Sequence, residues 1–416
     1  MKAAVEGYGC SLNQADTQSI KGLLEENCIT LSRLEDLGKG DLAVINACAV
    51  KETTEKRMLS RIQKLFQLSK KQGFELIVFG CISRISSEKV AGISKSIVQM
   101  PPALEELSKF LKLGAQEFSP SSASVQESQV IAIIPICRGC LGNCSYCAVK
   151  KARGSLKSYG IEELKKRFEK EINAGRKEIW LTAQDCGCYG FDIGTSLAGL
   201  LKELLKVEGD FRIRLGMMNV QHLKKFLQEL LEQMSDERIF KFLHLPLQSG
   251  SNRLLKLMNR EYSVAEWLKA TKTARRKFPE LAIATDIIVG FPTETERKFE
   301  ETLKVLKKAG VDVVNISRFG KRPFTQAAGM KDLDSKVKKA RSRKAALECE
   351  KITRQRNKRM VGKIEAVLFD EKGKKGGMIA RAGNYKPVVL EKGVLGEFAK
   401  ARVEGVGKTF LKGKLE

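Results

Sequence analysis

Three short apolar runs near the N-terminus are each followed by a cysteine. The pairs are residues 2–8 with Cys10, 42–47 with Cys48, and 75–80 with Cys81. Amphipathic segments such as residues 53–71 separate the runs, and this alternation predicts a parallel sheet with right-handed crossovers. The carboxyl ends of parallel strands share one edge, where ligand sites form, so we expect the three thiols to converge. The alternative is three buried structural thiols, since free cysteine is commonly buried.

A second series of apolar runs begins after the polar, Ser-rich residues 119–129, which we interpret as a linker. Helical stretches separate most of these runs, and the series predicts a partial (β/α) barrel with function at its carboxyl strand ends. The six runs are residues 130–136, 178–183, 212–217, 241–247, 282–290 and 311–317.

The last part of the chain changes character twice. Residues 331–362 form a polar, basic helical stretch, and residues 363–416 alternate short strands with Gly-containing turns. The latter pattern predicts a small antiparallel β-barrel of a kind that often binds nucleic acid. The expected fold is therefore α/β in its first two domains, and the expected divisions are 1–118, 119–129, 130–330, 331–362 and 363–416.

Basic residues dominate the charge of the chain. Among its 416 residues are 75 Lys and Arg against 49 Asp and Glu, a net charge of +26 that favours a polyanionic partner. The excess of basic residues lies in residues 336–363 and continues into the expected barrel. A small barrel next to a basic helix suits a folded RNA surface. Tyr385 is expected either to stack on a base or to pack against its neighbours. The barrel cations are Lys372, Lys374, Lys375, Arg381 and Lys386.

Cysteine usage points to metal chemistry in a reducing compartment. The chain has 11 cysteines and only two histidines, and MKAAVEGYGC is no signal peptide, so a disulfide framework is not expected and any metal is held mainly by sulfur. No apolar stretch is long enough to span a bilayer. We expect a cytoplasmic protein without a membrane partner.

The stretch CRGCLGNCSYC, residues 137–147, allows three interpretations. Its two CxxC pairs supply four thiolates for zinc, although they lie closer together than in most structural zinc sites. Alternatively all four hold an iron–sulfur cluster. In the third interpretation Cys140, Cys144 and Cys147 hold three irons of a cubane and leave the fourth iron open. Its position after the first barrel strand suits a functional site.

The spacing Cys140-x3-Cys144-x-Tyr146-Cys147 resembles the radical S-adenosylmethionine (SAM) superfamily. The resemblance then extends over nearly the whole chain to the methylthiotransferases, and most closely to the archaeal and eukaryotic branch that acts on N6-threonylcarbamoyladenosine in tRNA. The terminal barrel resembles a TRAM domain. The matching motifs are YGCSLNQADT, INACAV, FGCIS, EIWLTAQDCGCYGFDIG, HLPLQSGSNRLLKLMNREY, TDIIVGFPTETE and VNISRFGKRPFTQAA.

The resemblance implies two [4Fe–4S] clusters. Cys140, Cys144 and Cys147 match the ligands of the cluster that cleaves SAM to a 5′-deoxyadenosyl radical, and Tyr146 is expected near the adenine of SAM. A second set matches the ligands of an auxiliary cluster that carries or supplies sulfur, while a second SAM donates the methyl group. This second set is Cys10, Cys48 and Cys81.

Polar groups at the expected strand ends are plausible SAM or substrate contacts or structural hydrogen-bonding groups. They are Gln184, Asp185, Gln248, Ser249, Gly250 and Asp286. Arg153 and Gly154 match the family's RG and are expected to grip phosphate or to lie on a solvated basic face. Cys28 and Cys349 are expected to be structural thiols, and Cys186 and Cys188 are expected not to be cluster ligands. His244 is expected to position other groups and not to act as a base.

The implied activity is addition of a methylthio group at C2 of N6-threonylcarbamoyladenosine at position 37 in the anticodon loop of tRNA. The implied partners are tRNA and a low-potential electron donor such as ferredoxin or flavodoxin, and we expect a monomer. The alternatives are a methylthiotransferase for N6-isopentenyladenosine or for a ribosomal-protein aspartate, and a non-catalytic RNA-binding iron–sulfur sensor. The basic terminal barrel disfavours the protein substrate.

Replacing Cys140, Cys144 and Cys147 together with Ala should leave about four irons per chain, held by the other three thiols. Iron analysis after anaerobic reconstitution measures this, and complete loss of iron would contradict the two-cluster interpretation. The control is Cys137→Ala, which should keep both the iron content and SAM cleavage because the fourth thiol is a spare.

Overall fold

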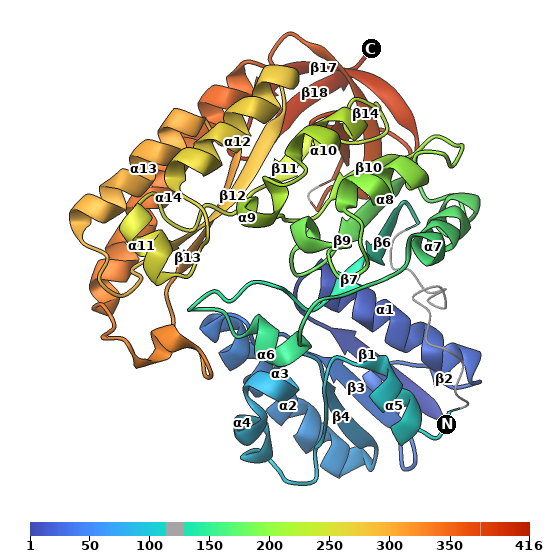
Figure 1. The fold of residues 1–416 in the computed structure, drawn as a ribbon. Helices are drawn as coiled ribbons and strands as arrows, with labels where there is room; N and C mark the ends of the chain where they lie inside the picture. The colour runs from blue at the N-terminus through green and yellow to red at the C-terminus, as the bar shows by residue number, and fades with distance from the viewer. Residues whose placement is uncertain (114–128, 375) are drawn as a thin grey trace.

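The computed structural model describes residues 1–113, 129–374 and 376–416, which form three parts (Figure 1). The N-terminal part, drawn in blue, is a sheet of five parallel strands in the order β2-β1-β3-β4-β5. The strands are β1 (Lys2–Gly7), β2 (Thr30–Leu31), β3 (Leu42–Asn46), β4 (Glu75–Phe79) and β5 (Val98–Met100). The expected parallel sheet is confirmed, with two short strands in addition.

Helices cover both faces of this sheet. Ala43 and Ile45 of β3 pack toward α2 (Glu52–Gln72), while Leu42 and Val44 pack toward α1 (Ser11–Glu26). Each strand therefore needs apolar side chains on both faces, which explains the continuous apolar runs in the sequence. The smaller helices here are η1 (Leu34–Asp36), α3 (Ile82–Ile85), α4 (Ser87–Ala91) and α5 (Leu104–Phe110).

The central part contains two parallel three-stranded sheets, β10-β9-β6 and β11-β12-β13. A parallel bridge between Ile213 and Ile239 joins them into one open, six-stranded arc, which confirms the expected partial barrel. The strands are β6 (Ile131–Pro135), β9 (Glu178–Thr182), β10 (Arg212–Leu215), β11 (Phe242–His244), β12 (Ala282–Val289) and β13 (Val313–Arg318). The expected linker, residues 119–129, lies outside the described residues except for its last residue.

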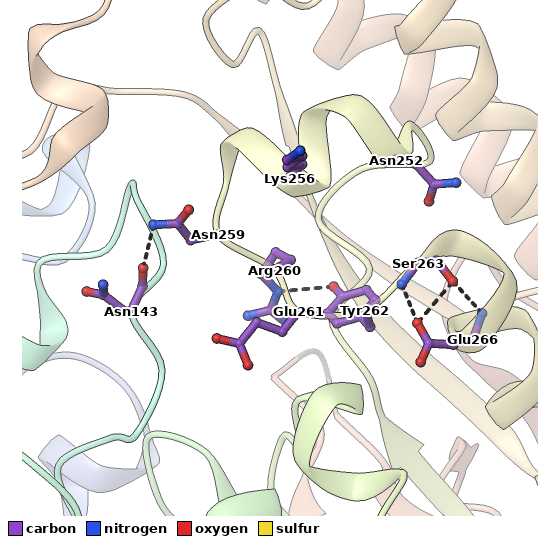
Figure 2. A pocket seen from close by; sticks show the side chains of 9 residues that line it. All are labelled: Asn143, Asn252, Lys256, Asn259, Arg260, Glu261, Tyr262, Ser263 and Glu266. Atoms are coloured by element: carbon purple, nitrogen blue, oxygen red, sulfur yellow. Dashed lines mark hydrogen bonds between the residues drawn. The ribbon is translucent and has the colours of Figure 1, made fainter.

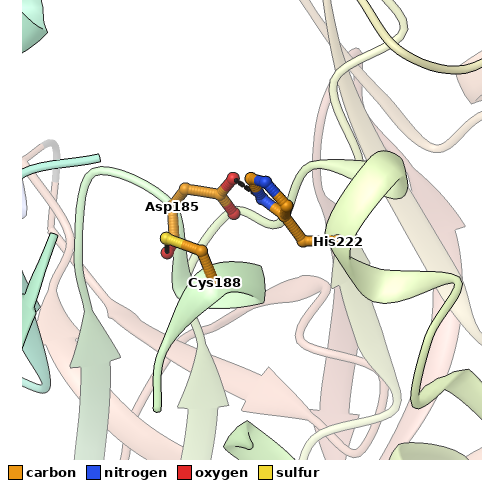
Figure 3. A group of neighbouring side chains, drawn as sticks. All are labelled: Asp185, Cys188 and His222. Atoms are coloured by element: carbon orange, nitrogen blue, oxygen red, sulfur yellow. Dashed lines mark hydrogen bonds and ion pairs between the residues drawn. The ribbon is translucent and has the colours of Figure 1, made fainter. Parts of the chain in front are cut away.

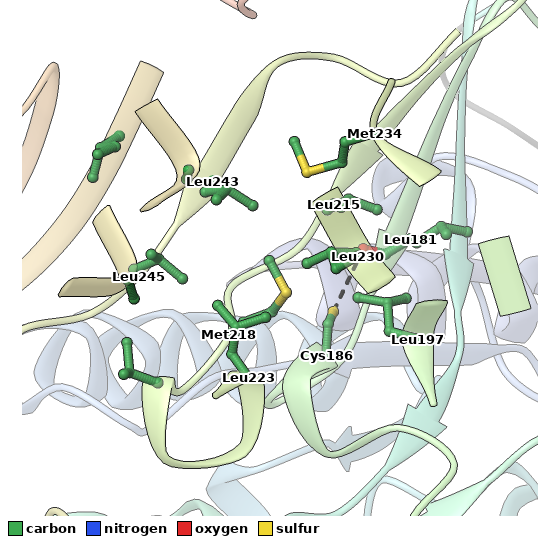
Figure 4. Close-up of a cluster of buried hydrophobic side chains, with 14 of the residues drawn as sticks. Leu181, Cys186, Leu197, Leu215, Met218, Leu223, Leu230, Met234, Leu243 and Leu245 are labelled. Carbon is green, nitrogen blue, oxygen red and sulfur yellow. Dashed lines mark hydrogen bonds between the residues drawn. The ribbon is translucent and has the colours of Figure 1, made fainter. Parts of the chain in front are cut away.

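Helices on the outside of the arc enclose one large apolar core. Figure 4 shows Leu181, Leu215 and Leu230 packed around Cys186, so this cysteine is part of the core. The helices of this stretch of chain are α6 (Val149–Arg153), which packs on the N-terminal part instead, α7 (Ile161–Asn173), η3 (Cys186–Cys188), α8 (Leu197–Leu204), α9 (Val220–Leu223), α10 (Leu227–Gln233), α11 (Asn252–Leu257), α12 (Val264–Lys277), α13 (Glu296–Ala309) and η4 (Gln326–Gly329). Strands β7 (Cys137–Arg138) and β8 (Lys157–Ser158) pair separately.

The long helix α14 (Ser335–Lys358) leads to a closed barrel of five strands in the order β14-β15-β16-β18-β17. The small barrel is confirmed, but β16 and β18 are parallel while the other pairings are antiparallel. A closed ring with an odd number of strands cannot alternate direction at every step, which explains the parallel pair. The strands are β14 (Ile364–Lys372), β15 (Met378–Ala382), β16 (Pro387–Leu390), β17 (Phe398–Val406) and β18 (Leu411–Leu415).

Tyr385 lies at the contact between this barrel and the central part, where its ring centroid is 4.9 Å from that of Phe240 and 5.1 Å from that of Phe242. The guanidinium groups of Arg214 and Arg381 lie over the same ring. Of the two expectations for Tyr385, packing is therefore correct and base stacking is wrong.

Many of the cations expected on an RNA surface are instead buried in ion pairs. Lys386 and Arg356 both bind the buried carboxylate of Asp312, at 2.7 and 3.2 Å, and Arg341 pairs with Glu294 at 2.9 Å. These side chains hold α14 and the barrel on the central part. Basic residues of α14 and the barrel that stay exposed are Lys336, Lys339, Arg343, Lys344, Lys351, Arg354, Lys358, Arg359, Lys372, Lys374, Lys392, Lys400, Arg402, Lys408, Lys412 and Lys414. Lys375 lies outside the described residues.

Arg322, which follows β13, ties the central part to the N-terminal part. It donates to Glu55 of α2 at 2.6 Å and to the carbonyl of Ala49, and both charged side chains are buried. Ser86 and Lys89 donate to the same carboxylate. Burial favours the protonated carboxyl, but the hydrogen bonds from Arg322 and these two groups outweigh it and lower the pKa of Glu55 to about 2.

Among the described residues, no helix is long and apolar enough to cross a bilayer.

Glu55→Gln should destabilise the protein by about 3–5 kcal/mol, because it leaves the buried Arg322 charge without a counterion. The folded-state pKa of Glu55 is below its ordinary value of 4.5. The stabilisation is therefore fully present above about pH 4.5 and is lost as the pH falls toward 2.

Urea unfolding at several pH values measures this difference. The matched control is Glu52→Gln in the same helix, which removes only an exposed pair with Lys56 and should cost less than about 1 kcal/mol. Equal losses for both variants at pH 7 would contradict the importance of the buried pair.

Candidate functional site

Cys10, Cys48 and Cys81 follow β1, β3 and β4, and the structure brings them together at the carboxyl edge of the N-terminal sheet. A Cβ on Gly9 would lie 2.9 Å from the Cβ of Cys48, so glycine is needed for this close approach. The Cys10 thiol donates to the side-chain oxygen of Asn13 at 3.5 Å. Burial, together with the nearby thiols of Cys81 and Cys10, raises the pKa of Cys48 to about 11.

Cys140, Cys144 and Cys147 lie on the loop between β7 and α6, at the carboxyl end of the central sheet. The amide of Gly142 donates to Cys140 Sγ at 3.2 Å, and Arg260 donates to Cys144 Sγ at 3.3 Å. Burial and the neighbouring Cys144 raise the pKa of Cys147 to about 12. N–H donors to ligand sulfur are common around iron–sulfur clusters, so these two contacts suit three ligands of such a cluster.

The fourth cysteine of the stretch does not join this set. Cys137 is fully buried in the main core and interacts with Cys188, which also contacts Cys140. The hydrogen bond with Cys188, together with burial, raises the pKa of Cys140. Cys28 is exposed and Cys349 is buried in the core. Cys188 thus contacts Cys140, although the two residues lie far apart in the sequence and nothing in the sequence reveals this contact.

Asp185, Cys188 and His222 form a compact buried group next to this loop (Figure 3). The carboxylate of Asp185 contacts His222 Nδ1 at 2.8 Å and accepts hydrogen bonds at 2.9 Å from the amides of Gly187 and Asn219. Both carboxylate oxygens are therefore already used within the protein. We interpret the group as a hydrogen-bonded support for the loop after β9. The sequence did not single out His222, which is distant along the chain.

The expected SAM-contacting residues differ in their surroundings. The side-chain oxygen of Gln184 is buried and has no hydrogen-bond partner within residues 1–113, 129–374 and 376–416, so it is available to a ligand. Gln248 lies four residues after β11, has a φ of +65°, and donates its backbone N–H to the carbonyl of Asp286. Ser249 is completely buried, and its hydroxyl accepts from the amide of Ser251, which leaves it a structural role. Tyr146 packs against an apolar cluster that includes Leu254, Phe291 and Phe319.

Polar side chains of the second three-stranded sheet, on β11 and β12, contact each other. His244 of β11 contacts Asp286 of β12, with His244 Nε2 2.6 Å from the carboxylate. Burial opposes ionisation of Asp286, but the contact with His244 outweighs it and lowers its pKa. Lys51, which follows the Cys48 loop, also stabilises this carboxylate. The edge of the N-terminal sheet and the edge of the central sheet therefore face each other.

A cleft of about 520 Å³ opens beside the cluster loop (Figure 2). Its lining includes Asn143 of the loop and Arg260, whose guanidinium also binds Cys144 Sγ, Asn219 and Tyr262. Asn259 donates to the carbonyl of Asn143 and so joins α11 to the loop. The cleft therefore reaches the loop residue Asn143 and the Arg260 side chain that donates to Cys144 Sγ.

Arg153 differs from both expectations for it. It is neither solvated nor placed to grip phosphate, because its side chain is 3% exposed and bonds Asp16 of α1 at 2.6 Å. The same guanidinium donates to Asn13 at 3.1 Å and to Cys81 Sγ at 3.4 Å. Arg153 belongs to α6, which follows Cys147. The short segment from Cys147 to Arg153 therefore begins in one thiol set and contacts Cys81 of the other.

Three family models match successive parts of the chain. Residues 2–100 match an uncharacterized protein family, UPF0004, residues 134–306 match the radical SAM superfamily, and residues 358–415 match the TRAM domain. A Pyrococcus horikoshii protein described as "probable threonylcarbamoyladenosine tRNA methylthiotransferase" is 41% identical over 100% of this chain and 99% of its own. The Homo sapiens threonylcarbamoyladenosine tRNA methylthiotransferase is 32% identical over 99% of this chain and 74% of its own.

Solved structures resemble this chain in fold alone. The radical SAM methyltransferase TsrM from Kitasatospora setae aligns with a TM-score of 0.60 at 11% identity, over 79% of this chain and 76% of that one. The cobalamin-dependent radical SAM enzyme OxsB aligns with a TM-score of 0.56 at 13% identity, over 79% and 54% of the two chains. The match of residues 134–306 to the radical SAM superfamily implies a [4Fe–4S] cluster and SAM, and the set of Cys140, Cys144 and Cys147 fits such a cluster.

Gly139→Ala should disrupt the cluster loop. Gly139 has a φ of +70°, and a Cβ there would lie 1.9 Å from the carbonyl oxygen of Ser155. We expect loss of the iron held by Cys140, Cys144 and Cys147, measured as iron per chain after reconstitution.

The control is Gly175→Ala, since Gly175 has a φ of +83° but open space around it. It should cost only about 1–2 kcal/mol of strain and leave the iron content unchanged. Full iron content in Gly139→Ala would contradict the tight loop packing.

Proposed function

The chain belongs to the threonylcarbamoyladenosine tRNA methylthiotransferase family, and from this we propose that it adds a methylthio group at C2 of N6-threonylcarbamoyladenosine at position 37 of tRNA. The observation that carries the proposal is the pair of thiol sets on two facing sheet edges. The chain's own part in the reaction is to bind and orient the reactants and to exclude water.

The first set would hold the radical-generating [4Fe–4S] cluster, which with SAM would supply the radical chemistry at C2. Cys140, Cys144 and Cys147 are its ligands, and Gly142 and Arg260 donate to the sulfurs. Gln184, two residues after β9, has a buried side-chain oxygen without a partner among the described residues, which supports a contact with SAM. Each donor is held by the fold before the cofactor binds, so little reorganisation is needed.

The second set would hold an auxiliary [4Fe–4S] cluster that would carry or supply the sulfur, and a second SAM would be the source of the methyl group. Cys10, Cys48 and Cys81 are its ligands. Three thiols at one edge, with a glycine that permits their approach and N–H donors nearby, support this assignment. A non-catalytic sensor would need only one cluster, so two sets favour the enzyme.

The RNA is bound by the exposed cations of α14 and the barrel, which the match to the TRAM domain supports. Arg354, Lys358 and Arg359 lie exposed near the end of α14, and Lys412 and Lys414 lie exposed on β18. The target base leaves the anticodon loop to reach the space between the two sheet edges, a small cost for a base that is already partly unstacked.

We further propose that the protein works as a cytoplasmic monomer with a low-potential electron donor such as ferredoxin or flavodoxin. The open cleft at Asn143 and Arg260 supports electron entry from the outer side of the cluster loop.

Reconstituted protein should cleave SAM to 5′-deoxyadenosine and convert an anticodon stem-loop that carries N6-threonylcarbamoyladenosine to its 2-methylthio form. Nucleoside mass spectrometry measures the product, in vitro and in tRNA from cells with and without the gene. A stem-loop with N6-isopentenyladenosine serves as the substrate control and should remain unmodified.

The variant Cys140→Ala should abolish both SAM cleavage and product. Modification of the isopentenyl substrate alone would contradict the proposed nucleoside. No SAM cleavage by fully loaded protein would contradict the enzyme and favour the sensor.

A further inference from the structure

Contacts between the central and N-terminal parts occur next to each of the three auxiliary thiols. Ser11, which follows Cys10, shares a hydrogen bond of 2.7 Å with Thr182 at the end of β9. Arg322 donates to the carbonyl of Ala49, which follows Cys48. Arg153 donates directly to Cys81 Sγ at 3.4 Å. The central part therefore completes the surroundings of a thiol set that the N-terminal part supplies.

Arg153 is the contact that reaches a sulfur atom. Its guanidinium is buried, and its Nη2 donates to Asp16 at 2.6 Å and to Asn13 at 3.1 Å. Asn13 in turn accepts from the thiol of Cys10 and donates to the side chain of Asn46. One guanidinium thus connects two of the three thiols and is held in place by a carboxylate and an amide.

The helix that carries Arg153 is anchored in the other domain. Ala148 and Ala152 are buried in the apolar core on the α2 side of the N-terminal sheet. Arg153 is the last residue of α6 (Val149–Arg153), which begins two residues after Cys147. The segment after the radical cluster loop is therefore also a wall of the auxiliary site.

We propose that Arg153 is a positioning residue of the auxiliary cluster, which stabilises the reduced form of that cluster through its N–H···S hydrogen bond and buried positive charge. The inference rests on the proposed auxiliary cluster. Reduction adds negative charge to the cluster, and hydrogen bonds to ligand sulfur together with nearby cations raise the reduction potential. Asp16 offsets part of this effect, because it places a negative charge on the far side of the guanidinium.

The test uses the background in which Cys140, Cys144 and Cys147 are Ala, so that any remaining iron belongs to the auxiliary set. In this background Arg153→Met should lower the midpoint potential of the cluster. We expect at least a tenfold weaker tendency to be reduced, which for a one-electron couple is about 59 mV. Redox titration followed by electron paramagnetic resonance measures the potential.

Asp16→Asn should shift the potential in the opposite direction, because it removes the counterion and leaves the charge of Arg153. The matched control is Lys151→Met, which removes an exposed cation from the same helix and should leave the potential unchanged. If Arg153→Met retains too little iron for titration, Arg153→Gln keeps N–H donors without the charge and should show a smaller decrease.

Shifts of the same sign in Arg153→Met and Asp16→Asn would show a general structural perturbation and overturn the proposal. An unchanged potential in Arg153→Met with full iron content would also overturn it, while the auxiliary cluster itself would stand. Absence of iron in the background variant with native Arg153 would overturn the auxiliary cluster, and the role of Arg153 with it.

Discussion

Two buried guanidinium–carboxylate pairs hold the edge of one parallel sheet against the edge of another, and the geometry of the site depends on them. Arg153 binds Asp16 and Arg322 binds Glu55, each from the central part to the N-terminal part. An unpaired charge buried at either place would cost several kcal/mol, so other orientations of the two parts are disfavoured. Because cysteines stand at both edges, the pairs that orient the domains also bring the two thiol sets together.

A similar device holds the terminal barrel. The buried carboxylate of Asp312 binds Arg275, Arg356 and Lys386, which come from the central part, α14 and the barrel respectively. Tyr385 adds an aromatic contact with Phe240 and Phe242. The count of 75 Lys and Arg therefore overstates the number of cations available to RNA, since some of them are paired with carboxylates inside the protein. The remaining exposed cations are placed by the barrel, at a fixed position relative to the reaction site.

Local sequence predicted the strands that carry the site and missed features with little local signal. The apolar runs before Cys10, Cys48 and Cys81 correspond to β1, β3 and β4, because strands covered on both faces need continuous apolar residues. Strands β2 and β5 have two and three residues, too few for any periodicity. Cys186 and Cys188 have almost the same neighbours in sequence, yet one packs in the core and the other contacts a cluster ligand.

The sequence by itself determined the fold class, the order of the three parts and the six thiols, because strand period and cysteine spacing are local properties. Tertiary structure decided which charged and aromatic groups serve the site. Arg153 lies in the basic run KKARG and Tyr385 in a polar turn, and both look like RNA contacts in the sequence. Each is instead buried by a partner more than 100 residues away, Asp16 for Arg153 and Phe242 for Tyr385. Such pairings depend on how the domains dock, a property that no single segment of the chain contains.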